Sequence, residues 1–115
     1  MSRQVTIQTK LQEESLVTQI LKEQFQVPFY FREFSGTRKL VIESPEGSLE
    51  LVQDPLGFKI SEEQEKLERV RPFLNKLQQT YSLERLKKIA SQAGYILSKI
   101  QQGPNQEWVV EVSKC

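Results

Sequence analysis

Few residues in this sequence could do acid–base or metal chemistry. Histidine is absent, and Asp54 is the only aspartate among the 115 residues. Because histidine is the commonest general base and metal ligand, its absence removes Ser–His triads and most zinc and iron sites. A paired carboxylate site joining Asp54 to Glu43 or Glu50 stays open, although Asp54 beside Pro55 and Gly57 is more simply a turn residue. The sequence therefore predicts no catalytic residue, no metal site, no cofactor and no enzymatic activity.

Basic side chains are concentrated in the later part of the sequence. The segment 69–99 contains a single acid, Glu84, together with Arg69, Arg71, Lys76, Arg85, Lys87, Lys88 and Lys99. Such a surface could dock a negatively charged partner or RNA. An ordinary solvated helix surface has the same composition, and most charge runs on helices are of that kind. From this set, the predicted partner-binding residues are Lys76, Arg85, Lys87 and Lys88.

A second candidate surface is a run of aromatic residues with arginines beside it. The run comprises Phe29, Tyr30, Phe31 and Phe34, with Arg32 and Arg38 next to them. Proteins that bind single-stranded RNA stack bases on such aromatic residues. Strand alternation sends Phe29 and Phe31 to one face and Tyr30 to the other, so part of the run belongs to the core. An exposed remainder favours a protein contact, and Tyr30, Arg32 and Arg38 complete the predicted partner-binding residues.

The elements that position these residues follow from periodicity. Alternation predicts a strand at 5–11, and an amphipathic helix follows that ends at Gln26-Val27-Pro28. The apolar stripe of that helix consists of Leu16, Val17, Ile20, Leu21 and Phe25. Strands at 29–34, 39–43 and 48–52 each end at turn residues, which favours an antiparallel meander. The last two strands share an apolar face made of Leu40, Ile42, Leu49 and Leu51, which helices should cover.

A helical region follows the meander. Ser61-Glu62-Glu63-Gln64 is a capping-box pattern and predicts that a helix begins there. Pro72 predicts a kink or the first turn of a new helix, and Ser82 is a candidate cap for a further helix. Gly94 is expected to be the left-handed residue just after the helical region.

Two closing strands at 95–100 and 107–112, joined by a turn at Gly103-Pro104-Asn105, complete the chain. The predicted order is β-α-β-β-β-α(α)-β-β. This is an α+β fold in which helices pack on one face of an antiparallel-rich sheet.

Length and composition indicate a single α+β domain over residues 1–115. Sixteen Lys and Arg against fifteen Asp and Glu give a net charge of +1, so overall charge selects neither nucleic acid nor membrane. Cys115 is the only cysteine, which excludes an internal disulfide framework. No stretch approaches the roughly 18 apolar residues of a membrane span. We therefore expect a soluble, cytoplasmic protein without membrane insertion.

Several motifs, taken in order, resemble one family. They are Thr6-Ile7-Gln8-Thr9-Lys10, Leu49-Glu50-Leu51-Val52-x-Asp54-x-x-Gly57 and Phe73-Leu74-x-x-Leu77-x-Gln79-x-Tyr81, followed by Gly94-Tyr95. Together they resemble the hypothetical chloroplast open reading frame 35 family, a domain of unknown function of cyanobacteria and algal plastids. The chain differs from that family at two places: it has Ser82 where the family favours alanine, and segment 24–28 lacks the glycine that the family usually has there. These differences indicate a divergent member. The resemblance implies a cyanobacterial cytosol or plastid stroma, and it carries over no catalytic residues.

The leading functional hypothesis is a non-catalytic accessory or adaptor protein that binds another protein. The resemblance implies a role in the assembly or regulation of photosynthetic machinery. The alternative is an RNA-binding module that uses the aromatic strand and the basic helix. A third reading is a small-molecule or weakly catalytic site in which Asp54 and a glutamate line a pocket.

Overall fold

The computed structural model of the protein describes residues 3–102 and 108–114. The chain divides into two compact units, residues 1–78 and 79–115, and helix α2 (Gln64–Gln92) contributes residues to both. The single domain expected over residues 1–115 stays a prediction. The two units are described in turn.

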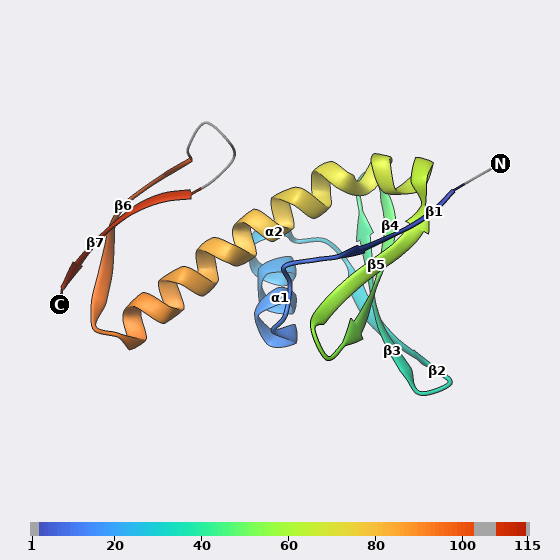
Figure 1. The fold of residues 1–115 in the computed structure, drawn as a ribbon, viewed down its shortest axis with the longest axis horizontal. Helices are drawn as coiled ribbons and strands as arrows, with labels where there is room; N and C mark the ends of the chain where they lie inside the picture. Colours follow the sequence, from blue (N-terminus) through green and yellow to red (C-terminus); the bar gives the residue numbers. More distant parts are fainter. Residues whose placement is uncertain (1–2, 103–107, 115) are drawn as a thin grey trace. The chain divides into compact units, whose positions relative to one another are not determined.

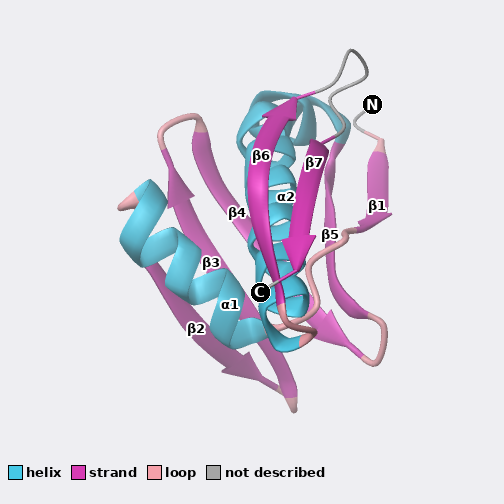
Figure 2. Ribbon diagram, turned by 90° about the vertical axis from the view of Figure 1, so that its left-hand side faces the viewer, coloured by secondary structure: helices cyan, strands magenta, loops and turns pink. Residues whose placement is uncertain are grey.

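The first unit is built on a five-stranded antiparallel sheet. Its strands are β1 (Gln4–Gln8), β2 (Phe29–Phe34), β3 (Thr37–Ser44), β4 (Gly47–Asp54) and β5 (Gly57–Glu63). Their order in the sheet is β1-β5-β4-β3-β2, so β1 and β2 are the two edges (Figure 2). Helix α1 (Glu14–Ile20) and the first part of α2 lie on the same side of this sheet (Figure 1). The predicted α+β class is confirmed.

One face of the sheet forms the core of the first unit. On the three inner strands, β3, β4 and β5, the apolar side chains of this face are fully or almost fully buried, at 0–1% exposure: Leu40, Ile42, Leu49, Leu51, Phe58 and Ile60. The register aligns them across the strands, since Leu51 lies opposite both Leu40 on β3 and Ile60 on β5. The predicted apolar face is therefore confirmed, and helix residues such as Val17 and Leu74 are buried as well.

Strand β5 is absent from the predicted order, and the capping box predicted at Ser61 is wrong. The strand continues to Glu63, and α2 begins at Gln64. The hydroxyl of Ser61 accepts hydrogen bonds from Gln4 Nε2 and Thr6 Oγ1 on β1, both at 3.0 Å, and so bridges two strands. Phe58 and Ile60 alternate with Lys59 and Ser61, which is the pattern of a half-buried strand. Tertiary pairing with β1 therefore overrides the local capping signal.

The first helix occupies the predicted position, and its last turn is wider than an α-helical turn. α1 continues directly into a π-helical turn, η1 (Leu21–Phe25). Gln26 follows in the left-handed conformation with φ 53°, and the amide of Val27 donates to the carbonyl oxygen of Leu21 at 3.3 Å. The ring of Phe25 packs edge-on against Phe73 of α2, with 5.4 Å between the ring centroids.

Helix α2 is continuous through Pro72 and Ser82, so neither residue begins a new helix. Pro72 lies inside it, and Ser82 is an interior helix residue, so the prediction of a cap for a further helix is wrong. Proline removes one backbone donor from the helix. Pro72 and Glu68, one turn earlier, are exposed, so water can satisfy the carbonyl group that the proline leaves without a donor.

The second unit contains the remainder of α2 and a two-stranded antiparallel sheet. Gly94 follows the helix with φ 83°, as predicted for a left-handed residue. Strand β6 (Tyr95–Gln102) pairs with β7 (Trp108–Lys114), with an irregularity between Leu97 and Lys99. The two predicted closing strands are thus confirmed. The turn predicted at Gly103-Pro104-Asn105, and Cys115, lie outside the described residues.

Candidate functional site

The most distinctive surface of the first unit is on the uncovered face of the sheet, at its β2 edge. Side chains along a strand alternate between faces, so Tyr30, Arg32 and Phe34 share the face opposite the core. Tyr30 is 47% exposed and Phe34 is 79% exposed, whereas Phe29 and Phe31 on the core side are half-buried. The predicted division of the aromatic run between core and surface is confirmed.

Two cations and one carboxylate lie next to these aromatic residues. Arg32 Nη1 donates to Glu50 Oε1 at 3.1 Å, and Lys39 Nζ lies 3.8 Å from Glu50 Oε2. Register explains the grouping, because Arg32 faces Lys39 on β3 and Glu50 projects from β4 on the same face. We refer to Tyr30, Arg32, Phe34, Lys39 and Glu50 together as the β2 surface. It carries a formal charge of +1 and presents two exposed aromatic rings.

A small apolar residue lies between side chains of the β2 surface. Val41 lies on the uncovered face but is only 3% exposed. Its cross-strand neighbours in the register are Tyr30 on β2 and Glu50 on β4. Tyr30 therefore combines a packing role with its exposed surface, whereas Phe34, at the end of the strand, is almost entirely available to a partner.

Sequence reasoning assigned Arg38 to the same surface, and the structure places it on the other face. Arg38 Nη1 donates to Glu14 Oε2 of α1 at 2.9 Å, and its guanidinium carbon lies 4.1 Å from the centroid of the Phe31 ring. These contacts join the start of α1 to the β2–β3 hairpin. Arg38 thus stabilises the first unit from the core side, and it does not meet Tyr30 or Arg32.

The predicted basic residues of the helix are divided between the two units. Lys76 belongs to the first unit, where its Nζ lies 5.7 Å from the Phe25 ring centroid. Arg85, Lys87 and Lys88 belong to the second unit, and Lys87 Nζ lies 3.3 Å from Glu84 Oε1. Intrahelical pairing of this kind is typical of a solvated helix surface.

Three members of the β2 surface were not among the predicted partner-binding residues, namely Phe34, Lys39 and Glu50. Phe34 could have been found from alternation, because it lies two positions after Arg32 and four after Tyr30 in one strand. Lys39 and Glu50 required the register between strands, which no local pattern in the sequence supplies.

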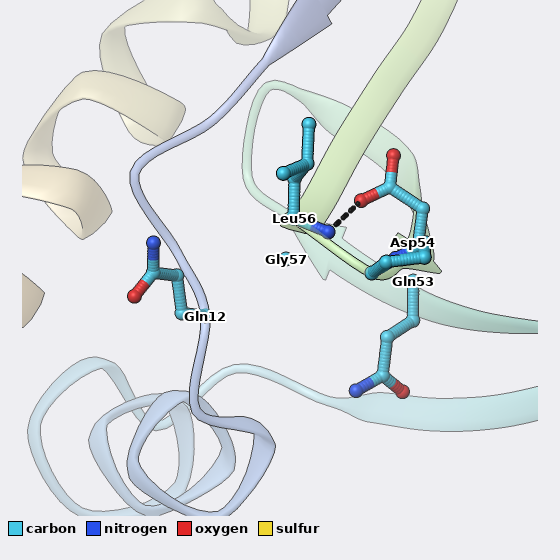
Figure 3. A pocket seen from close by; sticks show the side chains of 6 residues that line it. Gln12, Gln53, Asp54, Leu56 and Gly57 are labelled. Carbon is cyan, nitrogen blue, oxygen red and sulfur yellow. Dashed lines mark hydrogen bonds between the residues drawn. The ribbon is translucent and has the colours of Figure 1, made fainter.

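A shallow depression lies at the β4–β5 turn, with a volume of about 360 Å³. It is lined by Gln12, Gln53, Asp54, Pro55, Leu56 and Gly57 (Figure 3). Asp54 Oδ1 accepts a hydrogen bond from the Leu56 amide at 2.9 Å, and its Oδ2 lies 3.7 Å from Lys59 Nζ. The carboxylate is therefore engaged in stabilising the turn, as its position between strands predicts. In residues 3–102 and 108–114, no group of three or more metal-binding side chains is found.

Neither of the two glutamates considered as partners of Asp54 shares an ion pair with it. Glu50 is held by Arg32 and Lys39, and Glu43 is exposed on β3. The described residues therefore show Asp54 paired with a lysine, without a second carboxylate beside it in any ion pair.

None of the helices in the described part of the chain has the length of apolar residues needed to cross a bilayer. Comparison with protein-family models, with curated proteins and with solved structures finds no match for this chain. The function is therefore argued from the geometry of the β2 surface.

Proposed function

We propose that this protein is a non-catalytic adaptor that binds another protein through the β2 surface. The observation that carries the proposal is the exposure of Tyr30 and Phe34 on either side of Arg32 on one strand. Tyrosine and arginine are the residues that most often dominate the binding energy of protein interfaces. Two exposed rings on a rigid sheet also bury apolar area on binding while losing little conformational entropy.

The charges around the rings support a specific contact. Arg32 is exposed by 58% at its side chain, so it can contact a partner while Glu50 holds its orientation. A charge at the rim of an interface contributes mainly to specificity and to the rate of association. The resemblance to the chloroplast open reading frame 35 family extends the proposal to the assembly or regulation of photosynthetic machinery.

Site-specific photo-crosslinking tests this function. A photoreactive phenylalanine analogue is placed at position 34, and a control copy carries it at position 56, where Leu56 is 71% exposed at the β4–β5 turn. The full chain is irradiated in a native extract of the source organism. We expect a discrete crosslinked protein from position 34 and none from position 56. Equal labelling from the two positions, or none from position 34, would contradict the proposal.

An RNA-binding module is the second candidate, because exposed aromatic residues alternating with an arginine on a sheet can stack bases. Its support is weaker, since Arg32 pairs with Glu50 and Arg38 lies on the other face of the sheet. This function predicts salt-dependent binding of an unstructured oligouridylate that Lys87→Ala/Lys88→Ala weakens. No binding of the oligouridylate at low salt would remove the candidate.

A further inference from the structure

The backbone of β2 has one side without a partner strand in the described part of the chain, because β2 is an edge of the sheet. A backbone hydrogen bond just before the strand shows which backbone groups of β2 point toward β3. The amide of Glu43 on β3 donates to the carbonyl oxygen of Pro28 at 2.9 Å. The backbone of Pro28 therefore points toward β3.

Backbone hydrogen-bonding groups alternate between the two sides of an antiparallel strand. Because the carbonyl group of Pro28 points toward β3, the backbone N–H and C=O groups of the even-numbered residues of β2 point toward β3 as well. The N–H and C=O groups of Phe29, Phe31 and Glu33 then point away from β3, toward the free edge. Such a row of unpaired donors and acceptors is a template for an added strand.

The side chains beside this free edge are those of the β2 surface. A strand added next to β2 would place alternate side chains on the same face as Tyr30, Arg32 and Phe34, within contact distance of them. The edge and the exposed aromatic residues therefore form one continuous site, in which backbone pairing supplies affinity and side-chain contacts supply specificity.

We propose that the partner of the β2 surface is an extended peptide segment of another protein that adds to the free edge of β2 as a further strand. This segment carries a carboxylate side chain, with one apolar side chain two residues before it and another two residues after it. The inference rests on the proposed protein-binding function and specifies the chemistry of the partner.

The charges of the β2 surface indicate that the added peptide carries a carboxylate. Glu50 is shared by Arg32 and Lys39, so the surface has one cation in excess. A carboxylate on the added strand beside Arg32 gives each cation its own partner. Pairing of β2 with a second copy of the chain would instead bring another Arg32 into the site and would increase the excess of positive charge.

The other edge strand of the five-stranded sheet, β1, lacks these features. On the uncovered face β1 presents Gln4, Thr6 and Gln8, and it offers no exposed aromatic side chain. All three of these side chains are also occupied, because Gln4 and Thr6 donate to Ser61 and Gln8 donates to the carbonyl oxygen of Phe58. Within the five-stranded sheet, the free edge of β2 is therefore the one that combines unpaired backbone groups with side chains suited to a partner.

Fluorescence anisotropy with the full chain tests the proposal. The probe is a fluorescein-labelled peptide of the sequence Thr-Val-Thr-Glu-Thr-Val-Thr, which carries the inferred pattern on alternate residues. A peptide with lysine in place of the glutamate should bind roughly tenfold more weakly or not at all. N-methylation of one alternate set of peptide amides should abolish binding, and methylation of the other set should leave it intact, because only one set pairs with β2.

A matched pair of protein variants tests the edge itself. In Glu33→Pro the N–H that points to the free edge is removed, and the bonds to β3 are retained, as proline is tolerated at such edge positions. We expect affinity to fall roughly tenfold or more. Glu33→Ala removes the same side chain and should bind within about twofold of the original chain. Circular dichroism of both variants reports whether the fold is kept, and the methylated peptides test the edge without altering the protein.

Each alternative occupant has its own outcome. Unchanged peptide binding in Glu33→Pro, or equal effects of the two methylated peptides, would overturn strand addition. If the position-34 crosslinks persist under that result, the protein-binding function stands and only this inference fails. A dimer that Glu33→Pro dissociates, or an oligouridylate that displaces the peptide with higher affinity, would replace the inferred occupant by a second copy or by RNA.

Discussion

Arg38 and Glu14 form an ion pair at 2.9 Å that links the β2–β3 hairpin to the start of α1. The guanidinium group also lies over the Phe31 ring, 4.1 Å from its centroid. Arg32, six positions earlier, projects from the opposite face toward Glu50. Two arginines that look equivalent in the sequence therefore serve separate purposes, one in stability and one at the surface proposed for binding.

This separation gives a first prediction. Arg38→Ala should lower the free energy of unfolding by about 1 kcal/mol, because it loses both the ion pair and the cation–π contact. Arg32→Ala should change it by less than about 0.5 kcal/mol, since an exposed ion pair contributes little. The crosslinking yield from position 34 should fall in Arg32→Ala and stay unchanged in Arg38→Ala. Urea denaturation together with the crosslinking yield measures both effects, and equal losses of binding would argue against the assignment.

A second prediction concerns Gly57, which follows the β4–β5 turn at φ 124°. A Cβ atom there would lie 2.5 Å from the Leu11 carbonyl oxygen, so the backbone would have to move. Gly57→Ala should therefore lower the free energy of unfolding by about 2–4 kcal/mol. Gly36→Ala is the control, because Gly36 also has a positive φ, but a Cβ atom added there would meet nothing within 4 Å beyond its chain neighbours. Its cost should be only about 1–2 kcal/mol, from backbone strain alone. Chemical denaturation of the two variants distinguishes steric clash from strain.

Gln26 gives a third prediction, because it ends the π-helical turn with φ 53°. Glycine adopts this left-handed conformation without steric cost. Gln26→Gly should raise the free energy of unfolding by about 0.5–1 kcal/mol. The same change at Gln24, inside the turn, should lower it by up to about 1 kcal/mol. Thermal unfolding checks the two signs, and a loss of stability in both variants would show that the side chain of Gln26 matters more than its backbone conformation.

Asp54 gives a fourth prediction. Asp54→Asn keeps an oxygen that can accept the Leu56 amide and loses only the exposed contact with Lys59, so stability should change by less than about 0.5 kcal/mol. Asp54→Ala removes the acceptor and should cost about 1 kcal/mol. Equilibrium unfolding measures both. If Asp54→Asn also leaves binding of every ligand unchanged, the reading of Asp54 as part of a small-molecule or catalytic site is removed.

Local patterns were sufficient for much of this fold. Turn residues and alternation located β2, β3 and β4 close to their observed bounds, and the stripe from Leu16 to Phe25 located the first helix. The left-handed residue at Gly94 was also identified, because its conformation depends on the few residues around it.

The incorrect predictions came from positions where a distant contact decides the outcome. Ser61 lies in a sequence that caps helices, but its hydroxyl accepts bonds from β1, which is more than fifty residues away in the sequence. Ser82 is of a residue type that commonly caps the start of a helix, yet α2 continues through it. Local propensity is a weak determinant where packing can favour the alternative.

The sequence by itself determined the α+β class, the apolar face of the sheet and the shortage of residues for acid–base chemistry. These properties depend on composition and on periods of two or about 3.6 residues, which are present in the chain before it folds. Only the tertiary structure decided which strands form the edges, that Arg32 and Lys39 share Glu50, and that Arg38 lies on the other face. Each of these depends on the register between strands, which is set by cooperative packing of the whole unit.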